Sequence, residues 1–384
     1  MSYNNNIETQ SLYIHWPFCP YKCHFCPFVA YAGQDSSMGR YHKALKKEIE
    51  LFAHDEQKKA MVETIFFGGG TPSTYPDELL LDMSGTLRSV FAISDDAEIS
   101  IEVNPGTVHS GQIELWKGIG INRLSVGVQS LNDKVLQNLN RHQSASDVIK
   151  LIDYAHPIIN NISIDLIIGL PGVSDQEWKQ LINTVTTWPI THISIYFLTI
   201  HEGTALYFRV KKQDVTLPVD EHVVDLYLWT VDQLAAHGFE QYEISNFGKN
   251  GFTARHNQVY WSQKPYKGFG VGACSFDGLS RFQNKKDLFK YLDAVDQGKE
   301  VVEFEELLTQ EQQFLELLML GLRQRKGILL TTLLECIEHS RRIELQQTIN
   351  ELVETNYIHC EEGYVRLTPT GLAVENEIIV RLSR

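Results

Sequence analysis

Six short segments rich in β-branched and aromatic residues alternate with longer segments of helical periodicity along the first half of the chain. They start at residues 11, 64, 98, 122, 161 and 191, so 24 to 53 residues separate one start from the next. Spacings of this size suit strand–helix–strand crossovers, which make consecutive strands parallel. Residues 38–56 have the apolar periodicity of one such helix. The pattern predicts an α/β fold with a parallel sheet.

Glycine, proline and polar side chains gather where these six segments end. The endings are WPFC, GGGTP, VNPG, GVQS, GLPG and LTIHEG. In a β/α barrel all such ends lie on the C-terminal face, where sites are built. Turns alone require glycine and proline, but they do not require Cys19, Glu102, Gln129 or Asp165. The sequence therefore predicts a partial parallel (β/α)6 barrel with a site on that face.

The pattern changes toward the C-terminus. Residues 309–327 and 333–356 have helical character, and residues 357–382 predict a short hairpin followed by a last helix. These features indicate a small helical winged domain that contacts protein or covers the barrel mouth, because it has no basic recognition helix for DNA. We expect three parts: a barrel carrying the site in 1–240, a connecting region in 241–302 and the winged domain in 303–384.

Composition limits the partners and the compartment. The net charge is −14, from 34 basic and 48 acidic residues, which argues against nucleic acid as the main partner. No stretch approaches the roughly 18 apolar residues of a membrane span, and the first ten residues lack the features of a signal peptide. Three of the six cysteines lie within eight positions, unlike a disulfide framework. We therefore expect a cytoplasmic protein without a transmembrane segment.

The three clustered cysteines are Cys19, Cys23 and Cys26, directly after the first predicted strand. Cysteine thiolates are the usual ligands of iron–sulfur clusters. In a [4Fe–4S] cluster, three cysteines leave one iron open for a small molecule. The alternative is a closed zinc site completed by His15 or His24. His24 lies between two of the cysteines and the spacing is unusual for zinc, so the pattern favours the cluster.

The segment SLYIHWPFCPYKCHFC, which begins at Ser11, resembles the radical S-adenosylmethionine proteins, and more narrowly the oxygen-independent coproporphyrinogen III oxidase group. The resemblance extends over most of the chain. Its further motifs, in order, are FFGGGTPS, SIEVNPGT, RLSVGVQSLND, LNRHQ, IDLIIGLPG, QYEISNF and RHNQVYW. It implies that S-adenosylmethionine completes the coordination of the open iron through its amino and carboxylate groups, while the protein orients and shields the cofactors.

The resemblance also implies a set of S-adenosylmethionine contacts. Gly69, Gly70 and Thr71 match the residues that contact the methionine part, where glycine lets the backbone come close. The other matching positions are Tyr13, Phe25, Glu102, Gln129, Arg141, Asp165 and Thr199. Glu102 and Asp165 suit a sulfonium cation or ribose hydroxyls. Either carboxylate could instead pair with a neighbouring arginine or cap a helix.

Two departures separate the chain from the oxidases proper. Those carry another cysteine two residues after the last cluster ligand, where this chain has Phe28, and they have a longer extension before the first strand. The chain is more similar to the haem-chaperone branch, which carries the pattern H-N-x-x-Y-W, here His256, Asn257, Tyr260 and Trp261. That similarity implies His256 as a haem ligand with aromatic rings over the porphyrin. A histidine hydrogen-bonded within a loop is the alternative.

The leading hypothesis is a protein that holds a [4Fe–4S] cluster, S-adenosylmethionine and haem, and delivers haem to haem-requiring respiratory apoproteins. Its partners would be haem or another tetrapyrrole, the haem-accepting apoproteins and an electron donor for the cluster. One alternative is an enzyme that decarboxylates coproporphyrinogen III to protoporphyrinogen IX in porphyrin biosynthesis. Another is a radical enzyme acting on a different tetrapyrrole. We expect the remaining cysteines to be core or incidental residues, namely Cys274, Cys336 and Cys360.

Overall fold

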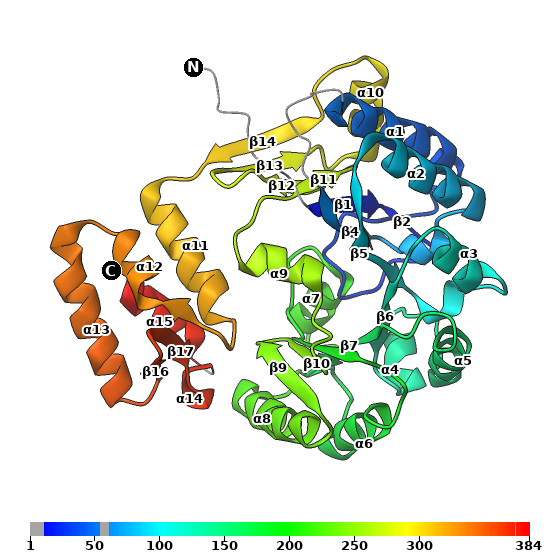
Figure 1. Ribbon diagram of the computed structural model, residues 1–384. Coiled ribbons are helices and arrows are strands. Elements are labelled where there is room, and N and C mark those ends of the chain that lie inside the picture. The colour runs from blue at the N-terminus through cyan, green and yellow to red at the C-terminus, as the bar shows by residue number, and fades with distance from the viewer. Residues whose placement is uncertain (1–10, 54–60, 373) are drawn as a thin grey trace.

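The structure, a computed structural model, describes residues 11–53, 61–372 and 374–384. Its largest sheet has nine strands in the order β11-β1-β4-β5-β6-β7-β8-β10-β9 (Figure 1). The six strands from β1 to β8 in this order run parallel. They are β1 (Ser11–Trp16), β4 (Val62–Gly69), β5 (Ile93–Val103), β6 (Arg123–Gln129), β7 (Ile162–Ile168) and β8 (His192–Phe197). Each corresponds to one predicted segment, which confirms the α/β fold and its partial parallel barrel.

Both edges of the sheet are extended by later parts of the chain. β11 (Lys267–Phe269) pairs in parallel with β1, whereas β10 (Asn246–Lys249) pairs antiparallel with β8 and carries β9 (Phe239–Glu243) outside it. The sequence ended the barrel at residue 240, but these edge strands lie in the region predicted to be a connection. The division of the chain into domains stays a prediction.

Helices cover the outer side of the parallel strands (Figure 1). Two of them begin with capping boxes, in which Ser144 or Ser174 exchanges hydrogen bonds with the acidic residue three positions later. Their apolar faces and the strands bury one continuous core that includes Trp16, Trp116 and Trp178. The covering helices are α1 (Met38–Ala53), α2 (Asp77–Val90), α3 (Gln112–Gly118), α5 (Ala145–Ala155), α6 (Asp175–Val185) and α8 (Asp220–Ala236). The helix expected over 38–56 thus begins as predicted, while residues 54–56, like the first ten, lie outside the described residues.

Short elements fill the space around the C-terminal ends of the strands and link the barrel to the last part of the chain. A three-stranded antiparallel sheet follows the barrel, with β13 between its two neighbours. These elements are β2 (Phe18–Cys19), β3 (Tyr31–Ala32), α4 (Asp133–Asn138), α7 (Ala205–Lys211), α9 (Arg255–Trp261), β12 (Cys274–Phe276), β13 (Ser280–Asn284), α10 (Leu288–Asp296) and β14 (Val302–Leu307).

The C-terminal part has a separate apolar core that includes Leu318, Ile349 and Val365. Its helices are α11 (Gln310–Leu322), α12 (Leu330–Glu335), α13 (Arg342–Glu354), α14 (Pro369–Leu372) and α15 (Glu375–Ser383). They pack on a small sheet formed by β15 (Ile328–Leu329), β17 (Tyr364–Leu367) and β16 (Ile358–Glu361). The predicted helical domain with a β wing and a last helix is confirmed. None of the helices in the described ranges combines the length and apolar character that a membrane crossing needs.

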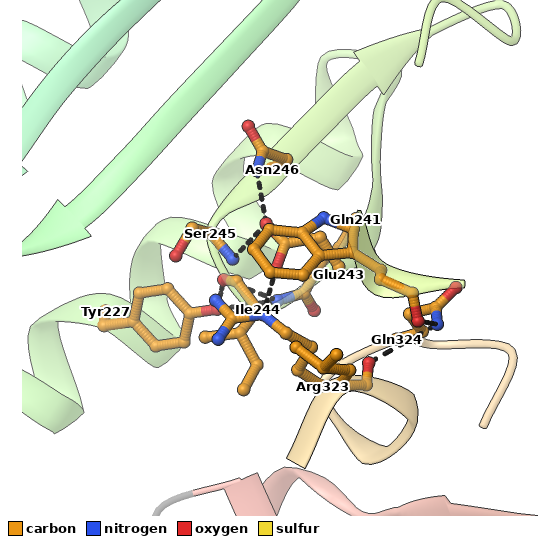
Figure 2. Close-up of polar contacts among 10 residues, drawn as sticks. Tyr227, Gln241, Glu243, Ile244, Ser245, Asn246, Arg323 and Gln324 are labelled. Atoms are coloured by element: carbon orange, nitrogen blue, oxygen red, sulfur yellow. Dashed lines mark hydrogen bonds and ion pairs between the residues drawn. The ribbon is translucent and has the colours of Figure 1, made fainter. Parts of the chain in front are cut away.

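A buried ion pair joins the C-terminal part to the barrel (Figure 2). The Glu243 side chain is fully buried, and its Oε2 accepts a hydrogen bond from Arg323 Nε at 2.9 Å. Its other oxygen accepts from the Ser245 amide at 2.9 Å and contacts the Asn246 amide group. The Arg323 guanidinium also lies over the Trp261 ring, 4.5 Å from its centroid. The end of α11 is therefore fastened to both β9 and α9.

Candidate functional site

A cavity of about 440 Å³ lies at the C-terminal ends of the parallel strands. It contains the three clustered cysteines and every predicted S-adenosylmethionine contact except Tyr13. The predicted residues that line it are Cys19, Cys23, Phe25, Cys26, Gly69, Gly70, Thr71, Glu102, Gln129, Arg141, Asp165 and Thr199. Side chains that far apart in sequence meet because parallel strands bring their C-terminal ends to one face.

The cysteine loop is held by hydrogen bonds on both sides. The His24 amide donates to the Leu139 carbonyl at 2.9 Å, which anchors the middle of the loop to the end of α4. Thr71 Oγ1 donates to Cys19 Sγ at 3.2 Å, and Arg141 Nη1 lies 3.7 Å from Cys23 Sγ. Burial raises the pKa of the Cys19 thiol to about 11. A thiolate at this position therefore requires positive charge and donors beside it, which favours a metal cluster as its partner.

The geometry disfavours the zinc alternative. Within the described ranges, no three side chains of histidine, cysteine, aspartate or glutamate are placed to hold a single metal ion. The ring nitrogens of His15 contact Tyr13 Oη at 3.0 Å and the Val29 carbonyl at 2.9 Å, and His24 Nδ1 lies 3.1 Å from the Asn138 carbonyl. A cubane differs from zinc because each cysteine binds a different iron. The loop therefore fits a [4Fe–4S] cluster better.

The glycines at the end of β4 are required by the close approach of β4 to β1. A Cβ atom at Gly69, where φ is +118°, would lie 2.5 Å from the His15 ring. One at Gly70 would lie 2.7 Å from the Pro17 carbonyl carbon. Larger residues cannot be accommodated at either position. The packing thus requires these glycines and leaves their backbone open toward the cavity.

Two carboxylates face the cavity without a cationic partner. The Gly69 amide donates to Glu102 Oε2 at 3.0 Å, and Ser125 Oγ donates to Asp165 Oδ2 at 3.1 Å. In the described part of the chain, neither carboxylate has an ion-pair partner within 4 Å, so the pairing considered from the sequence is not formed. Burial raises the pKa of Glu102 to about 8 and also raises the pKa of Asp165. Such groups become ionised when a cation binds beside them, which suits a sulfonium or ammonium group.

Replacing Glu102 by glutamine is expected to stabilise the protein prepared without its cofactors. The pKa of about 8 in the folded state lies above that of an unfolded glutamate, about 4.3. The protonated carboxyl therefore favours folding at low pH, and this contribution is lost as the pH rises through about 8. Scanning calorimetry should show a larger rise in Tm for Glu102→Gln at pH 9 than at pH 5. Equal shifts at the two pH values would contradict this assignment, and Glu63→Gln on the exposed side of β4 is the control.

The remaining predicted contacts lie on the far wall of the cavity. Gln129 has a left-handed backbone, with φ +66°, at a bulge where β6 ends. Strained backbone of this kind concentrates at functional sites. Arg141 is fixed by hydrogen bonds to the Gly127 carbonyl at 2.7 Å and to Gln143 Oε1 at 2.8 Å. These contacts hold the guanidinium in the cavity beside the cysteine loop.

His256 lies away from this cavity. Its Nδ1 is 2.7 Å from Thr64 Oγ1 and its Nε2 is 2.8 Å from Tyr260 Oη. Its amide donates to Glu98 Oε1 at 3.0 Å, and the side chain is only 1% exposed. Burial lowers the pKa of His256 to about 3, so the ring is neutral. Both nitrogens are occupied, and binding an iron would require one hydrogen bond to break. Its role as a haem ligand stays a prediction.

A second cavity of about 560 Å³ adjoins the first. It was not predicted from the sequence, although the aromatic residues of the H-N-x-x-Y-W pattern form part of it. Pro27, Phe28 and Gly69 line both cavities. Tyr13, expected among the S-adenosylmethionine contacts, lines this second cavity instead. Other lining residues are Tyr260, Trp261, Lys264, Tyr266, Cys274, Phe276, Arg281 and Lys286.

Comparisons with known proteins agree with this architecture. The family model described as the Radical SAM superfamily matches residues 13–185, and the HemN C-terminal domain matches residues 308–374. The chain is 34% identical over 373 residues to "Heme chaperone HemW" of Bacillus subtilis (strain 168), covering 96% of this chain and 98% of the relative. It is 28% identical over 372 residues to the protein of the same name from Lactococcus lactis, covering 97% and 96%.

The fold also resembles that of a solved protein. Coproporphyrinogen III oxidase (HemN) from Escherichia coli matches with a TM-score of 0.85 and 22% identity, covering 99% of this chain and 91% of that one. This likeness concerns the fold, whereas the near-full-length identity to the bacterial relatives establishes the family. Membership of the radical S-adenosylmethionine proteins implies a [4Fe–4S] cluster and S-adenosylmethionine. The chain belongs to this superfamily, in the HemN-like branch that includes the proteins named heme chaperone HemW.

Proposed function

We propose that this protein is a radical S-adenosylmethionine haem chaperone of the cytoplasm, which binds haem and transfers it to haem-requiring apoproteins. The observation that carries the proposal is the similarity, over 96% of the chain, to a relative named as a heme chaperone. The absence of a cysteine two residues after Cys26 also favours it over the oxidase alternative. An electron donor for the cluster and the haem-accepting apoproteins are the proposed partners.

The first cavity is the proposed site of the cluster and of S-adenosylmethionine. Cys19, Cys23 and Cys26 would hold the cluster, which when bound supplies an open iron and an electron. Thr71 Oγ1 and the Arg141 guanidinium, through their contacts with cysteine sulfurs, stabilise the thiolates. The remaining proposed contacts with S-adenosylmethionine are Phe25, Gly69, Gly70, Glu102, Gln129, Asp165 and Thr199, with Tyr13 behind Gly69 in the adjoining cavity.

The same Glu102→Gln variant is expected to bind S-adenosylmethionine less tightly. A hydrogen bond to a charged group contributes about 1.5–3 kcal/mol, so its loss corresponds to a roughly tenfold or larger increase in Kd. Calorimetric titration of the reconstituted protein under anaerobic conditions measures this change. Unchanged affinity in Glu102→Gln, with Glu63→Gln as the control, would show that the carboxylate does not contact the ligand.

One anaerobic experiment separates the candidate functions. The protein is reconstituted with iron and sulfide, reduced in the presence of S-adenosylmethionine and offered either coproporphyrinogen III or haem. We expect stoichiometric haem binding and no conversion of coproporphyrinogen III. Transfer is then followed as the gain of haem by a haem-requiring apoprotein. The appearance of protoporphyrinogen IX would contradict the chaperone proposal and establish the oxidase.

A further inference from the structure

The second cavity has a charge that is opposite to that of the first. The first cavity contains the carboxylates of Glu102 and Asp165, whereas the second is lined by Lys264, Arg281 and Lys286 and by no acidic side chain. Basic groups around a concave surface attract an anionic ligand. Two adjoining cavities thus suit two ligands of different charge, a cation in the first and an anion in the second.

Two of the three basic groups are available to a ligand. Arg281 is engaged by Glu316, with Nη2 to Oε2 at 2.5 Å. Neither the Lys264 nor the Lys286 ammonium group has an ion-pair or hydrogen-bond partner among the described residues, and both side chains are exposed. The lysines can therefore pair with carboxylates of a bound molecule without losing an existing contact.

The walls between these basic groups are aromatic. The rings of Tyr260 and Tyr266 meet edge to face with centroids 4.7 Å apart. Trp261 lines the same wall, and its indole Nε1 is buried without a hydrogen-bond partner. Phe28, with 63% of its surface exposed, lies at the partition from the first cavity. Aromatic walls with a few convergent polar groups suit a flat apolar molecule.

Cys274 supplies an iron-binding atom at this wall. Its side chain is exposed and lines the cavity, and Gln283 Nε2 donates a hydrogen bond to its Sγ at 3.3 Å. A cysteine thiolate is an established axial ligand of haem iron. His15 also lines the cavity, but both its ring nitrogens are already occupied. Cys274 is thus better placed than His15 to bind iron, although the sequence suggested that it was incidental.

We propose that this second cavity is the haem site, with the Cys274 thiolate as the iron ligand and with Lys264 and Lys286 paired with the two propionates. Coordination releases the thiol proton to solvent and changes no oxidation state. His256 acts as a positioning residue, because its Nε2 holds the hydroxyl of Tyr260 on the cavity wall. This inference rests on the proposed haem-binding function and gives that function a location.

The test is a titration of the full-length, cluster-reconstituted protein with ferric haem, followed by difference absorption and electron paramagnetic resonance. We expect a thiolate-type haem spectrum in the wild-type protein. Cys274→Ser should lose this spectrum and bind haem at least tenfold more weakly. Cys360→Ser, an exposed cysteine in the C-terminal hairpin, is the matched control and should behave as wild type.

The lysines are tested with the same titration. Lys264→Glu combined with Lys286→Glu should weaken haem binding at least tenfold and keep the thiolate-type spectrum, while Lys299→Glu, an exposed lysine that does not line the cavity, should have no effect. Unchanged affinity in the double variant would overturn the assignment of the propionates. Equal iron and sulfide contents in all variants exclude misfolding as the cause of any loss.

The outcomes distinguish this inference from the function on which it rests. Haem bound by wild type and by Cys274→Ser with the same affinity and spectrum would overturn the site, while the chaperone proposal would stand. A spectrum that is lost in His256→Ala and retained in Cys274→Ser would restore the histidine as the ligand and also overturn the inference. If wild-type protein binds no haem, the proposed function itself fails.

Discussion

Replacing Cys19, Cys23 and Cys26 together by alanine is expected to abolish the binding of iron and sulfide. After anaerobic reconstitution the wild-type protein should hold about four irons per chain, as a [4Fe–4S] cluster requires, and the triple variant close to none. The reason is that all three thiols come from one loop beside a cavity, and the other cysteines lie elsewhere. Chemical assays of iron and acid-labile sulfide, with the visible absorption of the cluster, measure the result.

The matched control is a variant with alanine at Cys336 and Cys360, which do not line the first cavity. It should keep the full iron content. The triple variant should also lose the tight binding of S-adenosylmethionine, since no open iron remains to accept its amino and carboxylate groups. Iron retained by the triple variant, or stoichiometric zinc in anaerobically prepared wild type, would invalidate the assignment of the cluster.

The second large effect is expected from Arg323→Ala at the junction with the barrel. The Glu243 carboxylate would remain fully buried without its cationic partner, and breaking a buried pair in this way costs roughly 3–5 kcal/mol. The stacking of the guanidinium on Trp261 would be lost as well. Thermal unfolding followed by circular dichroism should show a marked fall in the lowest unfolding transition.

Arg366→Ala provides the comparison for this variant. Arg366 pairs with Glu361 at 2.9 Å, but the Glu361 side chain is 66% exposed. An exposed pair contributes about 0–1 kcal/mol, so this control should unfold close to the wild-type temperature. Similar losses in the two variants would show that burial of Glu243 does not govern the stability of the junction.

The parallel strands could be predicted from the sequence because their signal is local. Each buried strand is a short run of apolar and β-branched residues, such as Ile162–Ile168, bounded by turn residues. The edge strands gave no such signal. β11 is three residues long and pairs with β1, more than 250 positions earlier, so only tertiary contacts define it as a strand.

The first cavity was also predictable, because its residues follow strands that a parallel sheet must bring to one face. The second cavity was not, since Phe28, Tyr260 and Cys274 come from three separated segments whose contact depends on the path of the connections. The burial of His256 likewise depends on Thr64 and Glu98, which are distant in sequence. No spacing of residues around His256 reveals these partners.

The partition formed by Pro27, Phe28 and Gly69 has a thermodynamic consequence. These residues belong to the walls of both cavities, so any displacement of them alters both binding sites at once. If a ligand in one cavity prefers one position of the partition, it changes the affinity for a ligand in the other, and linkage makes this coupling free energy equal in both directions. Loading one chamber would then set the rate at which the other empties, without any contact between the two occupants.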